Sequence, residues 1–389
     1  MKILLIGEYS NTHNTLAQGL RSLGHEVCVM SNGDFWKDYP RDIDVARKPG
    51  KLGGIRLMLQ LWTLLPKMRG YDVVQLINPM FFQLKAERLF FFYHYLRKHN
   101  KRVVLGAFGM DWYWVHECTT NKPLRYSDFN FGNQVRTDAT AVKEQKDWLG
   151  TEKERLNKMI ANDCDAIVTG LYEYDVCYRP HFPEKTHFIP YPIATLTSLT
   201  PLTPLTPLTP LTPLTSLTSL TSLTPLTPLT PIKLFIGISK QRSAYKGTDI
   251  MLTAAEDIVR KYPQQAVLLK AEGVPFEQYQ HMMDNSDVLL DQLYAYTPAM
   301  NALLAMSKGI VVVGGGEEEN YEILHEDELR PIINVEPNYE SVFQALEELV
   351  LHPEKMLQLK RQSVEYVAKH HDYVKVAKRY ETLYQQLLP

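Results

Sequence analysis

A low-complexity run of eleven triplets divides this chain of 389 residues into two parts. From Ser198 to Thr230 every triplet is Ser or Pro followed by Leu-Thr, without a break and without a charge. A Pro or Ser at every third position does not continue a helix, and a period of three does not match the period of two of a strand. We therefore predict a linker over residues 195–231, between an N-terminal domain over 1–194 and a C-terminal domain over 232–389.

Composition predicts a soluble globular protein and excludes several classes of function. Residues 1–194 hold 26 Lys and Arg against 21 Asp and Glu, and this net charge of +5 is too small an excess for binding nucleic acid. The four cysteines are scattered, with no Cys-x-x-Cys and no histidine cluster nearby, so we expect neither a metal site nor disulfides. The N-terminus has no signal segment, and no window holds the ~18 apolar residues needed to span a bilayer. We expect a cytoplasmic protein.

Two segments of the N-terminal part combine apolar and aromatic residues with cations. Residues 55–65 are followed by Lys67 and Arg69, and residues 89–102 end with four Lys and Arg. Apolar helices flanked by cations are typical of enzymes that rest on an anionic membrane face. Buried helices with cationic ends give the same pattern, so a peripheral membrane contact and a packing role both stay open.

Strands and helices alternate on both sides of the linker. Before it, strands at 3–7 and 26–30 enclose a helix at 15–23, and further strands are expected at 73–77, 102–105 and 166–169. After it we expect strands at 233–238, 266–270, 288–290 and 310–313, and helices at 248–262, 276–283, 298–308, 339–349 and 353–384. This alternation predicts an α/β protein with two doubly wound parallel sheets, both Rossmann-like. A ligand is expected in the cleft between the carboxyl edges of the two sheets.

Candidates for binding phosphate follow the strand at 233–238. The first strand of the chain is followed by Gly7 alone, without the Gly-x-Gly-x-x-Gly of a dinucleotide site, which disfavours a dehydrogenase. In the later loop, Arg242 and Lys246 lie four residues apart, with Gly247 at the turn. A guanidinium binds phosphate oxygens in pairs and an ammonium acts as a point charge, so the two suit a diphosphate. Solvated cations on a surface loop are the alternative.

Two further loops of the C-terminal part are expected at the same edge. Thr297 as N-cap, with Pro298 after it, predicts a helix whose free N–H groups would bind an anion. Tyr296 lies beside it, where an aromatic ring could flank a base or a sugar. Gly315 stands among three consecutive glycines that allow close approach of backbone to a ligand, and Glu318 follows them.

These segments resemble a known family. The pattern FIPYPI before the linker, Arg242 with the Tyr-Lys-Gly that ends at Gly247, and the segments AMSKG and VVVGGG are similar to those of the retaining glycosyltransferases of family 4, which have the two-domain GT-B fold. The resemblance implies a nucleotide-sugar donor whose diphosphate is held by Arg242 and Lys246. It also implies that no metal and no other cofactor is needed, and that the final helix crosses back to the first domain.

The sequence departs from this family at one pair of positions. The family carries two Glu residues eight positions apart, and here these positions hold Tyr296 and Leu304. A carboxylate that would bind the ribose or the sugar of the donor is therefore missing. Asn301, Asp291 and the segment 317–319 are the candidates to replace it.

Candidates for the acceptor side lie in the N-terminal part. Asp111 is in a region that faces the reacting sugar in similar enzymes, so we expect it to contact or deprotonate the acceptor hydroxyl, with a helix cap as the alternative. Trp112 and Trp114 offer faces that suit sugar rings, although this aromatic segment would equally pack on its own lobe. His13, after the first strand, is a further candidate to line the cleft near the acceptor, with a structural role as the alternative.

We therefore predict a hexosyltransferase-like enzyme that moves a sugar from a nucleoside-diphosphate sugar to a saccharide. The acceptor is expected to be lipid-linked, at the inner face of the plasma membrane, in the assembly of cell-surface polysaccharide or lipopolysaccharide. A non-catalytic glycan- or nucleotide-binding protein would also explain Leu304, and a nucleotide-sugar epimerase or a phosphorylase would keep the fold with another reaction.

Overall fold

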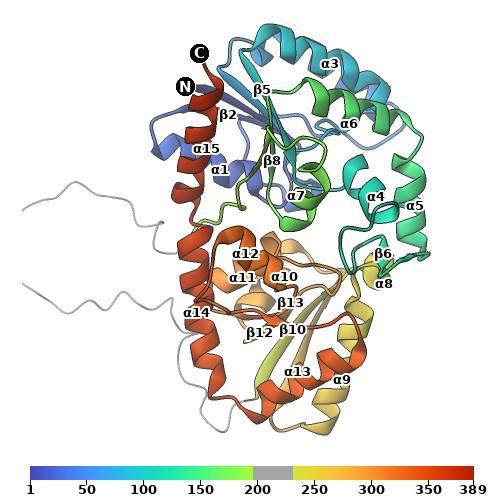
Figure 1. Cartoon of the computed structure of the whole chain (residues 1–389), viewed down its shortest axis with the longest axis vertical. Coiled ribbons are helices and arrows are strands. Elements are labelled where there is room, and N and C mark those ends of the chain that lie inside the picture. The colour runs from blue at the N-terminus through green and yellow to red at the C-terminus, as the bar shows by residue number, and fades with distance from the viewer. Residues whose placement is uncertain (196–230) are drawn as a thin grey trace, which may run out of the picture.

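The computed structural model describes residues 1–195 and 231–389. The triplet repeat, and with it the predicted linker apart from its two end residues, lies outside the described residues. On each side of it the chain forms a lobe built around a parallel sheet (Figure 1). The prediction of an α/β protein with two parallel sheets is confirmed.

The sheet of the N-terminal lobe has seven strands, all parallel, in the order β3-β2-β1-β4-β5-β8-β9. Its central strands are apolar and buried along almost their whole length, as strands covered by helices on both faces must be. The strands are β1 (Lys2–Ile6), β2 (Glu26–Ser31), β3 (Ile43–Asp44), β4 (Val73–Leu76), β5 (Arg102–Ala107), β8 (Ala166–Thr169) and β9 (Thr186–Phe188). The helices are α1 (Thr12–Ser22), α2 (Gly53–Leu64), α3 (Ala86–His99), α4 (Trp112–Thr119), α5 (Ala139–Trp148), α6 (Glu152–Asp163) and α7 (Tyr172–Tyr178), with 3-10 turns η1 (Phe35–Lys37) and η2 (Leu65–Met68) and a small antiparallel pair, β6 (Asn130–Phe131) and β7 (Gln134–Val135).

The sheet of the C-terminal lobe has five parallel strands in the order β11-β10-β12-β13-β14. The strands are β10 (Ile232–Ile238), β11 (Ala266–Glu272), β12 (Val288–Leu290), β13 (Val311–Gly314) and β14 (Ile333–Asn334). The helices are α8 (Ser243–Lys246), α9 (Thr248–Lys261), α10 (Phe276–Asp284), α11 (Met300–Ser307), α12 (Glu318–Leu324), α13 (Tyr339–Leu351), α14 (Lys355–His370) and α15 (Tyr373–Leu387), with the 3-10 turn η5 (Lys240–Arg242) before α8.

Two predicted helix boundaries are wrong. The helix expected from Pro298 begins at Met300, with Ala299 as its N-cap, because the hydroxyl of Thr297 donates a hydrogen bond to Glu173 and does not cap the helix. The helix expected over 353–384 is divided into α14 and α15. Asp372 starts the second of them, since its carboxylate accepts hydrogen bonds from the backbone N–H groups of the first turn.

Helix α15 leaves the C-terminal lobe and packs against α1 of the N-terminal lobe (Figure 1). The two helices approach closely at Gly19, where a Cβ would collide with the carbonyl oxygen of Tyr373 and lie 2.6 Å from the Cβ of Ala377. Near its end, the hydroxyl of Tyr384 donates to the Oε1 of Gln75 at 2.7 Å. The N-terminal lobe is therefore completed by the last segment of the chain. Among the described residues, no helix is long and apolar enough to cross a membrane.

Candidate functional site

A cavity of about 1050 Å³ lies where the carboxyl edges of the two sheets face each other. This interlobe cavity is lined by the loops that follow β1, β10, β11 and β12, together with the start of α11. Its position agrees with the general rule that ligands of parallel α/β sheets bind beyond the carboxyl ends of the strands.

Lys246 is the predicted phosphate ligand that reaches this cavity. It is the last residue of α8, and Gly247 follows in a left-handed turn with φ +73°. Burial, and next the charge of Arg242, lower the pKa of Lys246 below its ordinary value of 10.5. Its ammonium has no hydrogen-bond or ion-pair partner within 1–195 and 231–389. A partly buried ammonium that forms no ion pair or hydrogen bond, on a cavity wall, is suited to an anionic ligand.

Arg242 lies on the outer side of the same loop. Its side chain is exposed, and its guanidinium stacks 5.3 Å from the ring centroid of Tyr245. It is not among the residues that line the interlobe cavity. The structure thus places Lys246 in the cavity wall and Arg242 beside it.

A short chain of hydrogen-bonded polar side chains also lines the cavity. The hydroxyl of Tyr279 donates to the Oδ1 of Asn301 at 3.1 Å, and the Nδ2 of Asn301 donates to the Oδ1 of Asp291 at 3.3 Å. Burial raises the pKa of Asp291, while the ammonium of Lys246 acts in the opposite direction. Leu304 lines the cavity one helical turn after Asn301. Asp291 therefore supplies a carboxylate to the cavity. Position 304, where the resembled family carries Glu, supplies only the apolar side chain of leucine.

Aromatic side chains from both lobes meet at the edge of the cavity. The ring of Phe276, at the start of α10, lies edge-on to Trp36 at 5.3 Å and to Tyr39 at 5.9 Å. The chain before them is strained, because Asp34 and Phe35 have φ of +58° and +59° without being glycine. Such strain is concentrated at functional sites.

Comparison with known proteins assigns this architecture. No protein-family model matches the sequence, and no curated protein matches it. Sucrose-phosphate synthase from Thermosynechococcus elongatus aligns with a TM-score of 0.60 at 12% identity, over 100% of this chain and 99% of that chain. HepE from Anabaena, solved in complex with UDP and glucose, aligns with a TM-score of 0.57 at 12% identity, over 98% and 99% of the two chains. UDP-GlcNAc 2-epimerase from Neisseria meningitidis, solved bound to UDP-GlcNAc, aligns with a TM-score of 0.53 at 12% identity, over 99% and 100%. The chain has the GT-B fold.

Tyr296 and Thr297 lie at the contact between the two GT-B lobes and do not line the interlobe cavity. The carboxylate of Glu173, from α7, accepts hydrogen bonds from the N–H groups of Tyr296 at 2.7 Å and Thr297 at 3.0 Å, and from the hydroxyl of Thr297 at 2.5 Å. The hydroxyl of Tyr296 accepts a hydrogen bond from the N–H of Arg125 at 2.7 Å. The backbone donors expected to bind a ligand anion are thus bound by a carboxylate of the other lobe.

The loop after β13 also takes part in the contact between the two lobes. A Cβ at Gly315 would collide with the carbonyl oxygen of Ala295, so this glycine allows two loops of the same GT-B lobe to pack closely. Arg125 of the N-terminal lobe forms ion pairs with Glu317 at 2.5 Å and Glu319 at 2.6 Å, and Glu318 is exposed and pairs with Arg330 at 2.8 Å. Gly315 and the segment 317–319 do not line the interlobe cavity, so of the candidates to replace the missing Glu only Asp291 and Asn301 do.

Asp111 occupies the capping position that was the alternative to a catalytic role. It is completely buried, its Oδ1 accepts a hydrogen bond from the N–H of Trp114 at 2.9 Å, and its Oδ2 accepts one from the hydroxyl of Tyr178 at 2.7 Å. Burial raises the pKa of Asp111 to about 7. In this geometry its carboxylate is part of the core of the N-terminal lobe and has no exposed edge in the interlobe cavity.

The other acceptor-side candidates are also buried. Trp112 stacks on His116 with ring centroids 4.3 Å apart, and Trp114 packs edge-on to Tyr174 at 5.5 Å, so this aromatic segment packs on its own lobe. His13 is fully buried with its Nδ1 2.9 Å from the carbonyl oxygen of Gly7, and burial lowers its pKa to about 3. None of the three lines the interlobe cavity.

Several cavity residues were not among the candidates from sequence. Trp36 and Tyr39 follow β2, and Glu272 ends β11. The rule that ligands lie beyond the carboxyl ends of strands would have indicated these positions, because each follows or ends a strand of the predicted sheets. The rule does not say which of many such loops converge.

Proposed function

We propose that this protein transfers a glycosyl group from a nucleoside-diphosphate sugar to a hydroxyl group of a saccharide, with retention of configuration and without a metal ion. One observation carries the proposal: the unpartnered ammonium of Lys246 lies in the wall of a cavity of about 1050 Å³ between two GT-B lobes. HepE, which has a similar fold, was solved with UDP and glucose bound, and this supports a nucleotide-sugar ligand.

The charges around the cavity suit departure of a nucleoside diphosphate. Negative charge grows on the leaving diphosphate as the glycosidic bond breaks, and Lys246 with Arg242 would stabilise that charge. Asp291 and Asn301 would accept and donate hydrogen bonds to hydroxyl groups of the ribose or the sugar, in place of the carboxylate that Leu304 does not provide.

Removing the ammonium tests the proposal. We expect Lys246→Ala, and likewise Arg242→Ala, to lower kcat/KM for donor consumption by about 10²-fold or more, as expected for the loss of a charge that stabilises a leaving group. The measurement is release of nucleoside diphosphate across a panel of nucleotide sugars and acceptors. Arg361→Ala, an exposed cation on α14, is the control. Wild-type turnover in Lys246→Ala would contradict the proposal.

An epimerase is the second candidate, because UDP-GlcNAc 2-epimerase aligns with this chain almost as well as the glycosyltransferases do. The two functions differ in their need for an acceptor. A nucleotide sugar converted to its epimer without acceptor would favour the epimerase, whereas nucleoside diphosphate released only with acceptor would favour transfer. Binding with no turnover in either assay would favour a non-catalytic binding protein.

We further propose that the enzyme acts at the inner face of the plasma membrane, in assembly of cell-surface polysaccharide or lipopolysaccharide. Helix α2 supports this, since the residues 52, 55, 59 and 62 form an apolar stripe on its outer face and are each 48% exposed or more. Between Asp44 and Asp72 there are six cations and no carboxylate. Apolar side chains flanked by cations are favoured on anionic lipid.

Vesicle binding tests this attachment. We expect the protein to sediment with vesicles that contain anionic lipid and not with neutral vesicles. Each cation near an anionic surface contributes about 1 kcal/mol to binding. Ile55→Ser with Leu59→Ser should reduce sedimentation. The control is Leu351→Ser, at an exposed leucine of α13 in the other lobe. Equal sedimentation of all three proteins would contradict attachment through α2.

A further inference from the structure

Two side chains of the N-terminal lobe bind the backbone just before Lys246. The guanidinium of Arg136 donates a hydrogen bond to the carbonyl oxygen of Ala244, in α8, at 2.8 Å. The hydroxyl of Thr140, in the first turn of α5, donates to the carbonyl oxygen of Gln241 at 3.0 Å. Figure 1 shows α5 and β6 beside α8. The loop that leads to Lys246 is therefore held at two points by the other lobe.

Arg136 is built into the contact between the two lobes. Its side chain is 11% exposed, and it forms an ion pair with Asp138 at 3.1 Å. Within its own lobe it donates to the carbonyl oxygen of Ser127 at 3.1 Å, and across the contact its guanidinium lies 3.8 Å from the ring centroid of Tyr294. A planar guanidinium with several N–H donors suits such a set of partners, because it binds carbonyl oxygens and stacks on a ring at the same time. Arg136 thus connects the N-terminal lobe to the backbone of α8.

Tyr245, the residue before Lys246, is anchored in the same contact. It belongs to the C-terminal lobe, but its side chain is buried in the hydrophobic core of the N-terminal lobe. There the ring of Phe129 lies edge-on to it, with centroids 6.2 Å apart, and the guanidinium of Arg136 lies 5.7 Å from its centroid. Consecutive side chains of a helix point about 100° apart. Burial of Tyr245 in the other lobe therefore sets the direction in which Lys246 leaves α8.

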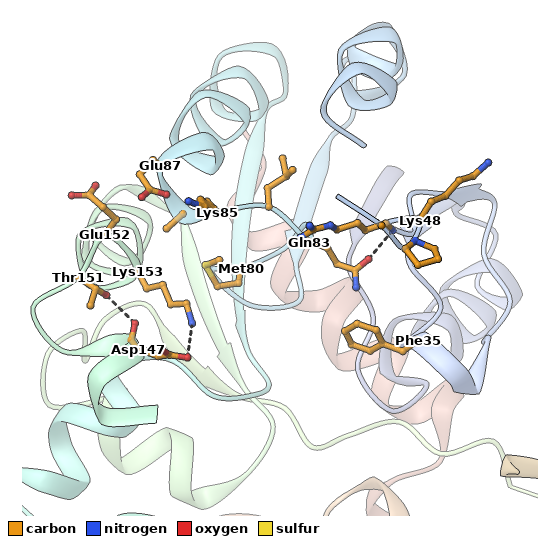
Figure 2. A pocket seen from close by; sticks show the side chains of 15 residues that line it. Phe35, Lys48, Met80, Gln83, Lys85, Glu87, Asp147, Thr151, Glu152 and Lys153 are labelled. Carbon is orange, nitrogen blue, oxygen red and sulfur yellow. Dashed lines mark hydrogen bonds and ion pairs between the residues drawn. The ribbon is translucent and has the colours of Figure 1, made fainter. Parts of the chain in front are cut away.

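Helix α5 supports this contact from within the N-terminal lobe. Its last turn borders a second cavity, of about 890 Å³, that lies inside the lobe (Figure 2). There the hydroxyl of Thr151 donates to the carbonyl oxygen of Asp147 at 3.0 Å, and Lys153 forms an ion pair with the carboxylate of Asp147 at 3.7 Å. Trp148, at the end of the helix, is buried. Because the far end of α5 is fixed in its own lobe, its first turn presents Thr140 to the other lobe in one position.

Helix α8 depends on such contacts because it is short. It has four residues, and no side chain caps its N-terminus. A helix of this length is not stable by itself, so its place is decided by what it packs against. After Lys246 the chain is held by its own lobe, since the carbonyl oxygen of Lys246 accepts a hydrogen bond from the N–H of Leu293 at 3.0 Å. The residues before Lys246 are held by the N-terminal lobe.

We propose that Arg136 is a positioning residue, which fixes α8 from the N-terminal lobe and so directs Lys246 into the interlobe cavity. That Lys246 then stabilises a leaving diphosphate rests on the proposed function, whereas the placement of α8 by Arg136 does not. The hydrogen bond to Ala244 exists only while the two lobes touch at this point. Lys246 is therefore in place only while this contact is made.

Hydrogen exchange of the full chain without ligand tests the placement of α8. We expect Arg136→Ala to speed exchange at the amides of residues 243–247 by about tenfold or more, because α8 loses the hydrogen bond of a charged group. Arg125→Ala is the matched control, since Arg125 also joins the two lobes but forms ion pairs with the segment 317–319. In this control, exchange at α8 should stay as in wild type. Unchanged exchange at α8 in Arg136→Ala, or equal acceleration in Arg125→Ala, would overturn the inference.

A double-mutant cycle on the affinity for UDP tests whether Arg136 acts through Lys246. We expect Arg136→Ala and Lys246→Ala each to weaken UDP binding by about tenfold or more. The double variant should bind UDP no more weakly than Lys246→Ala alone, because a residue that only positions Lys246 has no effect once the ammonium is gone. Additive losses would show that Arg136 acts through general stability, and they would overturn the inference.

The two measurements separate this inference from the proposed function. Faster exchange at α8 in Arg136→Ala, with unchanged UDP affinity in Lys246→Ala, would support the placement of α8 and contradict only the proposed function. Weaker UDP binding in Lys246→Ala, with unchanged exchange at α8 in Arg136→Ala, would contradict only this inference.

Discussion

Burial shifts the pKa of several single titratable residues, some of which are site candidates from the sequence. It raises the pKa of Asp111 to about 7 and that of Glu8 to about 8, although N–H donors act in the opposite direction on both. It lowers the pKa of His13 to about 3, so this imidazole is neutral at physiological pH. The same effect lowers the pKa of Lys246, but this side chain borders a cavity that a phosphate could enter.

The buried carboxylate of Asp111 predicts a dependence of stability on pH. Between its ordinary pKa of 3.8 and about 7, the folded chain keeps a proton that the unfolded chain has lost, so stability falls as the pH rises through this window. From about pH 4 to pH 8, we expect wild type to lose up to about 4 kcal/mol relative to Asp111→Asn, at 1.36 kcal/mol for each pKa unit. Urea unfolding across this pH range measures the loss of stability. Glu256→Gln, at an exposed position of α9, is the control. Parallel curves for wild type and Asp111→Asn would show that Asp111 is ionised in the folded chain.

At the scale of elements, the pairing of α1 with α15 shows how one small residue places a helix. The Cα of Gly19 lies against the first turn of α15, and no larger residue fits without separating the two helices. Helix α2 shows the opposite case, because Gly54 has ordinary space around it, with Arg47 atoms 3.6 Å or more from a Cβ. The two glycines share a secondary structure and differ in their neighbours.

This difference predicts opposite effects of the same substitution. Gly54→Ala should stabilise the chain by about 0.5–1 kcal/mol, since alanine restricts the unfolded backbone and favours a helix. Gly19→Ala should destabilise it by about 1–3 kcal/mol, because the added methyl group overfills the contact with α15. Chemical denaturation of the two variants measures both effects. Stabilisation by Gly19→Ala would mean that α15 moves away from α1 at little cost.

At the scale of the whole molecule, the two lobes are joined by polar contacts as well as by α15. Glu173 binds the backbone before α11, and Arg125 forms ion pairs with the segment that follows β13. On the same side, Arg136 donates to the carbonyl oxygen of Ala244 at 2.8 Å, and its guanidinium stacks 3.8 Å from the ring centroid of Tyr294. These contacts join the N-terminal lobe to segments of the C-terminal lobe that neighbour the interlobe cavity without lining it.

Removing Glu173 should loosen the loop that precedes α11. In Glu173→Ala two buried N–H groups lose their acceptor, which costs about 1–3 kcal/mol for each group. We expect faster hydrogen exchange at Tyr296 and Thr297, a lower Tm and weaker binding of UDP, with Glu173→Gln less affected because it keeps one acceptor oxygen. Unchanged exchange at these two amides would show that the N-terminal lobe does not hold this loop.

The sequence by itself determined the architecture, because the periodicity of apolar residues and the repeat between the two halves are local properties. It also indicated the segments that hold Lys246 and Asn301, which both line the interlobe cavity, whereas Arg242 lies beside it. Only the tertiary structure decided which hydrogen-bond donors remain available to a ligand. Thr297 meets Glu173, which lies 124 positions earlier, and this contact removes the expected helix cap. Asp111, Trp112 and Trp114 are covered by other helices of their own lobe, because burial depends on neighbours that are distant in the chain.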